Sequence, residues 1–127
     1  MLSLPPSVRI FLARGVTDMR KSIDGLEAVT RLFLKRDPFS GDLFVFCNRR
    51  HNRIKVLYWE KSGFWLLHKR LEKGTFVWPA TEDIKHTHVE MDHVELAALL
   101  GGLDIRDAKR RKWYQRNPVN TSPVAVD

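Results

Sequence analysis

The sequence of 127 residues has one cysteine, Cys47, so a disulfide within the chain is excluded and no Cys-x-x-Cys metal knuckle is present. This cysteine usage is typical of proteins in a reducing compartment. No apolar run approaches the length that spans a bilayer, and residues 1–6 lack the long apolar core of a signal peptide. We therefore expect a cytosolic protein that does not associate with membranes.

Sequence motifs of the common catalytic classes are also absent. The chain has no Gly-rich phosphate loop, no Gly-x-Ser-x-Gly and no His-Glu-x-x-His. The acidic residues Asp18, Asp24 and Glu27 could form a magnesium-binding nuclease cluster, but basic residues alternate with them, so ion pairing is the simpler interpretation. Cys47 lies in an apolar run without a neighbouring base, which favours a buried, inert thiol. We expect neither catalysis nor a cofactor.

A metal site is a weak alternative at residues 86–90. His86, His88 and Glu90 would share one face of a strand, because side chains on a strand repeat every two residues. Three ligands from one strand point in parallel, however, and converge poorly on a single ion. An exposed strand face is the favoured interpretation, and we expect no metal.

Positive charge is what the sequence has in excess. Lys and Arg number 22 against 15 Asp and Glu, which gives a net charge of +7. Residues 49–55 carry +4 and residues 106–116 carry +5, so the rest of the chain is net negative. A charge that served solubility alone would be spread out, whereas this concentration indicates nucleic-acid binding.

Hydropathy patterns predict an α+β fold. We expect an antiparallel five- to six-stranded meander sheet, one long N-terminal helix packed on a face, and a short C-terminal helix. The long helix is predicted from about Asp18 to Lys35, capped by Thr17 or Asp18, and the short one over 94–100, capped by Asp92. Residues 1–105 form one predicted domain, and residues 106–127 a basic arm with a disordered tail. The predicted strands are residues 8–13, 43–47, 54–59, 64–71, 75–78 and 86–91.

The strands at 43–47 and 54–59 flank a short polar link, residues 48–53, which predicts a β-hairpin whose turn is basic. We call residues 48–53 the tip. Arginine side chains bind phosphate bidentately and can read guanine edges, so the tip is the first candidate for nucleic-acid binding. The predicted contacts are Arg49, Arg50, His51, Arg53 and Lys55, with Lys109, Arg110, Arg111 and Lys112 from the arm.

Two interpretations stay open for the segments around these contacts. The arm could order on nucleic acid or could be a solvated run of charge. Aromatic residues near the tip could stack on unpaired bases, but aromatic side chains fill cores more often. These aromatic residues are Tyr58, Trp59, Phe64 and Trp65.

Five segments carry motifs in a fixed order: RGVTDMRKSIDGL at 14–26, DPFSGDLFVFCNRR at 37–50, KVLYW at 55–59, GFW at 63–65 and KRLEKGTFVWP at 69–79. Together they resemble TnpB, the second-open-reading-frame protein of IS66 insertion sequences, which is distinct from the RNA-guided nuclease that shares this label. The resemblance covers roughly residues 5–105. Cys47, His51 and Asn52 depart from the pattern, in which more basic residues would be expected.

The resemblance implies an accessory role in transposition beside a separate transposase, and it supplies no catalytic residues. The expected partners are DNA, such as the transposon ends, and the transposase of the same element. The alternative is a subunit that docks on the transposase without touching DNA, through an exposed aromatic surface. The sequence fits a monomer or a dimer equally well.

Overall fold

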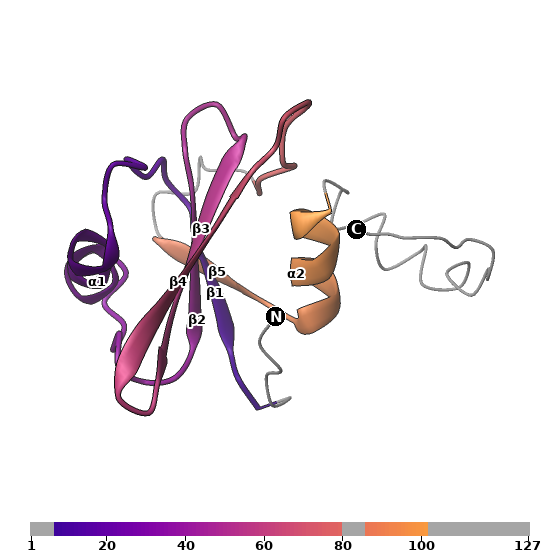
Figure 1. The fold of residues 1–127 in the computed structure, drawn as a ribbon. Helices are drawn as coiled ribbons and strands as arrows, with labels where there is room; N and C mark the ends of the chain where they lie inside the picture. Colours follow the sequence, from indigo (N-terminus) through magenta and orange to yellow (C-terminus); the bar gives the residue numbers. More distant parts are fainter. Residues whose placement is uncertain (1–6, 80–85, 102–127) are drawn as a thin grey trace.

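A computed structural model describes residues 7–79 and 86–101 of the chain. These residues form five strands and two helices, arranged as a sheet with α1 on one face and α2 on the other (Figure 1). In chain order the elements are β1 (Ile10–Ala13), α1 (Ile23–Leu32), β2 (Leu43–Cys47), β3 (Arg53–Glu60), β4 (Gly63–Arg70), β5 (His88–Met91) and α2 (His93–Leu100).

The sheet is mixed, with the strand order β4-β3-β2-β1-β5, so the predicted antiparallel meander is only partly correct. β2, β3 and β4 are antiparallel neighbours, as predicted. β1 and β2 are parallel, because α1 carries the chain back across the sheet between them. β5 pairs with β1 at the far edge rather than extending the meander from β4.

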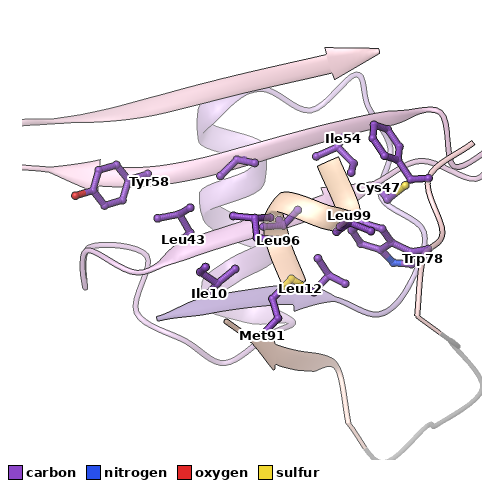
Figure 2. Packing of buried hydrophobic residues seen from close by; sticks show 13 residues of the cluster. Ile10, Leu12, Leu43, Cys47, Ile54, Tyr58, Trp78, Met91, Leu96 and Leu99 are labelled. Carbon is purple, nitrogen blue, oxygen red and sulfur yellow. The ribbon is translucent and has the colours of Figure 1, made fainter. Parts of the chain in front are cut away.

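The two central strands, β1 and β2, are buried on both faces. Ile10 and Leu12 of β1 face α2, while Phe11 faces α1, and β2 alternates in the same way. On the α2 side, Leu96 and Leu99 pack over the strands (Figure 2). On the α1 side, the buried Leu26 packs against the phenylalanines of β1 and β2. This double burial explains why both strands read as continuous apolar runs.

Helix α1 is shorter at both ends than the predicted helix from Asp18 to Lys35. Its N-cap residue is Ser22, because the residues before it form a separate turn. In that turn the Asp18 carboxylate accepts hydrogen bonds from the backbone and side chain of Arg20, which lower the pKa of Asp18 to about 2. At the other end, Lys35 has a positive φ of 58°, which no α-helix continues through.

A buried lysine ties this turn to the sheet. Lys55, in the middle of β3, is only 8 % exposed, and its Nζ donates to the carbonyl oxygens of Met19 at 2.9 Å and Lys21 at 2.7 Å. Lys55 thus binds two carbonyls of the turn that comes just before α1, whose N-cap residue is Ser22. The stem of Lys55 lies in the interior while its ammonium group satisfies both oxygens.

Residues 75–78, predicted as a strand, form no strand. They lie in the irregular segment after β4, which buries Phe76 and Trp78 on the α2 side of the sheet. The indole Nε1 of Trp78 donates to the Ala13 carbonyl at 3.1 Å. The aromatic residues that suggested a strand here are buried as anchors in the core and do not belong to a strand of the sheet.

The predicted cap of the C-terminal helix is confirmed. The Asp92 side chain accepts from the backbone N–H of Glu95, whose side chain accepts in turn from the backbone of Asp92. At the other end of α2, Lys69 of β4 donates to the Leu100 carbonyl at 2.7 Å. In the described parts of the chain, no helix is long and apolar enough to cross a membrane.

We predict that Lys55→Met destabilises the protein by about 1–3 kcal/mol, because two carbonyl oxygens lose a buried donor. Chemical denaturation of the purified variant measures this loss. Lys69→Met is the matched control: Lys69 is exposed and donates to one carbonyl, so its loss should stay within about 0.5 kcal/mol. Equal losses in the two variants would contradict the anchoring role of Lys55.

Candidate nucleic-acid interface

The strand directions bring several polar segments to one end of the sheet. β1 and β2 run parallel, and each neighbouring pair outside them is antiparallel. The tip therefore lies beside the segments that follow β1 and β4 and the segment that precedes β5. We call this end of the sheet the tip end. In Figure 1 the turn between β2 and β3 and the segment after β4 lie at the same end.

The tip is held in one conformation by the side chain of Asn48. Its Oδ1 accepts from the backbone N–H groups of Asn52 and Arg53, each at 3.0 Å, and its Nδ2 donates to the side chain of Asn52 at 2.8 Å. Asparagine side chains that bond backbone a few residues onward are typical of tight turns. His51 adopts the positive φ of 57° that the turn requires.

The segment after β4 supports the tip from the side. The backbone N–H of Leu71 donates to the Asn52 carbonyl at 2.8 Å, and that of Phe76 donates to the His51 carbonyl at 2.6 Å. The same segment is anchored in the core by the buried ring of Phe76. The tip is thus a supported loop, and its backbone does not depend on a ligand for order.

The structure separates the predicted contact residues of the tip. Arg49 and Arg50 are exposed at the turn, while His51 and Arg53 are half-buried. Lys55 is buried with its ammonium group bound to two carbonyls, so we remove it from the predicted phosphate contacts. The arm residues predicted beside them lie outside the described residues: Lys109, Arg110, Arg111 and Lys112.

Charge differs between the two ends of the sheet. Cationic residues at the tip end are Arg14, Arg49, Arg50, Arg53, Arg70 and Lys73. Asp18 and Glu72 lie among them, and each is paired with an arginine, Arg20 at 2.7 Å and Arg70 at 2.9 Å. The opposite end carries Asp42, Glu60 and Asp92 against Arg9 and Lys61. The excess of positive charge therefore gathers where the tip is exposed.

Two basic residues of β4 were missed in the sequence. Arg70 pairs directly with Arg53 across the hairpin, and His68 pairs with Lys55. Burial and the positive charges of Lys55, Arg53 and Arg70 lower the pKa of His68 below its ordinary value. The alternation of Leu66, His68 and Arg70 was readable in the sequence, but their position opposite Arg53 needed the register of the hairpin.

The four aromatic residues considered for base stacking lie at the end of the β3–β4 hairpin away from the tip. Tyr58 is buried on the α2 side, and Trp59 and Phe64 pack with Phe39 in a cluster whose ring centroids lie 5.0–5.3 Å apart. Trp65 is 47 % exposed, and its Nε1 donates to the Glu60 carboxylate at 2.9 Å, at the end of the hairpin away from the tip. Tyr58 thus fills the core, while the other three, half-buried or exposed, lie too far along the hairpin to stack on a base held at the tip.

The other polar candidates form ion pairs and ring contacts. Glu27 pairs with Arg31 at 2.9 Å on α1, as the ion-pair interpretation predicted. Glu90 pairs with Arg9 at 3.1 Å, and His88 meets the Phe11 ring edge-on at 5.3 Å. Within residues 7–79 and 86–101, no group of three or more His, Cys, Asp or Glu side chains gathers to hold a metal ion.

An apolar cavity opens on the α1 side of the tip end. Its volume is about 390 Å³, and its lining includes Ala13 at the end of β1, Val16 from the loop after it, Val29 of α1 and Phe33 just after α1. Val16 and Phe33 are each 51 % exposed, and the neighbouring Leu32 is 60 % exposed. Apolar side chains this exposed and this close together are characteristic of protein-interaction surfaces.

Comparison with known proteins gives one family. The family model described as IS66 Orf2 like protein matches residues 8–110. The chain is 35 % identical over 111 residues to the uncharacterized protein y4jC of Sinorhizobium fredii, covering 87 % of this chain and 92 % of that protein. It is 37 % identical over 106 residues to y4hO of the same organism, also uncharacterized, covering 84 % and 90 % respectively. No solved structure matches the chain.

Cys47, the last residue of β2, is predicted to be unreactive in the folded protein. It is 1 % exposed, and burial raises the pKa of its thiol to about 12. At pH 8 only about 10⁻⁴ of the thiol would then be thiolate, which is the reactive form. Iodoacetamide should not label the native protein at pH 8 but should label it fully in denaturant. Labelling of the native chain at the rate of a free cysteine peptide would contradict this.

Proposed function

The chain belongs to the IS66 Orf2-like family of insertion-sequence proteins, and from that premise we propose that it is a non-catalytic accessory protein that binds DNA through the tip end of its sheet. Arg49, Arg50 and Arg53 contact backbone phosphates, and the cationic side chains around them add attraction that does not depend on DNA sequence. The basic arm at residues 106–116 extends this contact.

One observation carries the proposal: the tip displays two adjacent exposed arginines, Arg49 and Arg50, on a turn that Asn48 and the segment after β4 hold in place. Neither arginine is needed for that support, because the bonds of the turn involve other residues. Arginines carried on a backbone that is already held in place suit a phosphate backbone, since no ordering of the loop remains to be done on binding.

A second candidate function is docking on the transposase, and the exposed apolar residues around the α1 cavity favour it. Of the predicted aromatic docking surface, Tyr58 is buried, Trp59 and Phe64 are half-buried and Trp65 is exposed; the residues around the cavity, Val16, Leu32 and Phe33, are all more than half exposed and would make the contact. Both functions can coexist, because the cavity and the exposed arginines of the tip are built from different residues. In this second function the chain bridges the transposase and its DNA.

We predict that Arg49→Gln combined with Arg50→Gln weakens DNA binding and flattens its salt dependence. Each phosphate contact adds about 0.9 to the slope of log K against log salt, so the double variant should lose about 2 from that slope. The measurement is a titration of wild type and variant with duplex, single-stranded and transposon-end DNA over a series of salt concentrations.

The matched control is Lys35→Gln combined with Lys61→Gln, which removes the same charge from two exposed positions outside the tip. If the control lowers affinity and slope as much as the tip variant, only net charge matters and the tip assignment is wrong. If the wild type binds none of the three DNAs at low salt, the DNA-binding function itself is wrong.

Docking predicts that Phe33→Ser reduces co-purification with the transposase of the same element in high salt and after nuclease treatment. An exposed aromatic anchor at an interface is worth more than about 1 kcal/mol, and high salt screens charge contacts but leaves apolar ones. Val94→Ser, on the exposed side of α2, is the control. Unchanged recovery of the Phe33 variant would exclude this surface as the docking site.

A further inference from the structure

The β3–β4 hairpin places basic side chains directly opposite one another on its α1-facing side. Arg53 pairs with Arg70, and at the next position on the same face Lys55 pairs with His68. The face is identified by Lys55, whose ammonium group reaches the turn before α1, and by Leu57, which packs in the α1-side core. Side chains alternate along a strand, so Arg53 and its partner Arg70 lie on this face too.

Farther from the tip the same face is apolar. Leu57 pairs with Leu66, and Trp59 pairs with Phe64. The charges are therefore confined to the tip end of the hairpin, next to Arg49 and Arg50. On the other face of the hairpin, Lys69 pairs with the apolar Ile54 and is bound to the Leu100 carbonyl, so that face has no comparable cross-strand pair of cations.

Like charges opposite one another across two strands destabilise a hairpin. Glu72 offsets part of this repulsion through its ion pair with Arg70, but the arginine and glutamate side chains are 53 % and 78 % exposed, so water screens that pair. Partial burial, together with the charges of Lys55, Arg53 and Arg70, lowers the pKa of His68. An anion held between these side chains would remove the repulsion.

We propose that Arg53, His68 and Arg70 form a phosphate-binding site that holds one backbone phosphate of the nucleic acid. This site rests on the proposed DNA-binding function and extends it from the tip along the hairpin. Paired residues on adjacent strands lie about 5 Å apart, and positions two apart on one strand lie about 7 Å apart, so three side chains of this length can reach one phosphate. Lys55, the fourth member of this face, is held by its two carbonyls.

The site defines the path that the nucleic-acid backbone takes across the protein. Arg53 is both the last residue of the tip and the first member of the ladder formed by Arg53, His68 and Arg70. A backbone that contacts Arg49 and Arg50 at the turn therefore continues over the α1-facing side of β3 and β4. It does not cross the α2-facing side, where Lys69 is bound to the end of α2.

The first test uses Arg70→Gln and His68→Gln, which leave the tip intact. For Arg70→Gln we expect several-fold weaker duplex binding and a loss of about 1 from the salt slope. Lys61→Gln, at the far end of the same hairpin, is the control and should bind like wild type. Arg53→Gln should weaken binding without lowering the melting temperature, because it also relieves repulsion in the free protein.

The second test follows the His68 imidazole by NMR while inorganic phosphate or a short duplex is added. Binding at this site should raise the pKa of His68, since an anion replaces repulsion by attraction, and Arg70→Gln should abolish the change. The imidazole of His93, on α2 across the sheet, is the internal control and should not respond.

The outcomes separate this site from the proposed function. If Arg49→Gln with Arg50→Gln weakens DNA binding while Arg70→Gln and His68→Gln do not, the tip binds DNA and the ladder site is wrong. If the wild type binds no DNA but phosphate raises the pKa of His68 in an Arg70-dependent way, the DNA function fails and an anion site remains. If DNA binds while the pKa of His68 stays unchanged, no phosphate sits at the ladder.

Discussion

Strands β1 and β2 are buried on both faces, and this constraint decides where the protein can meet a partner. A sheet that is apolar on both sides needs a covering layer on each, and α1 and α2 supply them (Figure 1). With its central strands covered, the sheet cannot present a flat open face to nucleic acid. Polar function is left to the strand ends, the loops and the outer hairpin, which is where the described cationic residues gather.

The covered sheet also explains why Lys55 was wrongly predicted to contact phosphate. In the sequence it is one of four cations in residues 49–55, and its place in the predicted strand 54–59 does not show what its side chain faces. In the structure its neighbours on β2 and β4 and the turn before α1 enclose it, so it satisfies two backbone carbonyls instead of a phosphate. The same contact involves the turn that stands where the predicted helix was to begin. Both differences between sequence and structure meet at this tertiary contact, which composition and periodicity do not contain.

The positions of most strands and helices could be predicted from local residues. The order and relative direction of the strands in the sheet could not. Alternating or continuous apolar runs gave the positions of β2, β3 and β4, and Asp92 marked the start of α2. The parallel β1–β2 pair and the edge position of β5 depend on how α1 crosses the sheet, which no local motif records. The turn at Lys61 and Ser62 could have given the register, and with it the pairing of Arg53 with Arg70.

Repulsion among the cations of the tip end destabilises the hairpin, and contacts made by neighbouring residues compensate for much of that loss. Asn48, the segment after β4 and the buried Phe76 hold the backbone of the tip, while Arg49 and Arg50 take no part in that support. A hairpin stabilised only by its own cross-strand pairs would lose stability from the Arg53–Arg70 repulsion. Here the hairpin is also tied to β2 and to the turn before α1, so it can keep that repulsion in the free state. A bound anion would relieve the repulsion between Arg53 and Arg70, and the free energy released would favour binding. The stability of the free hairpin and the affinity of the proposed phosphate site are therefore linked.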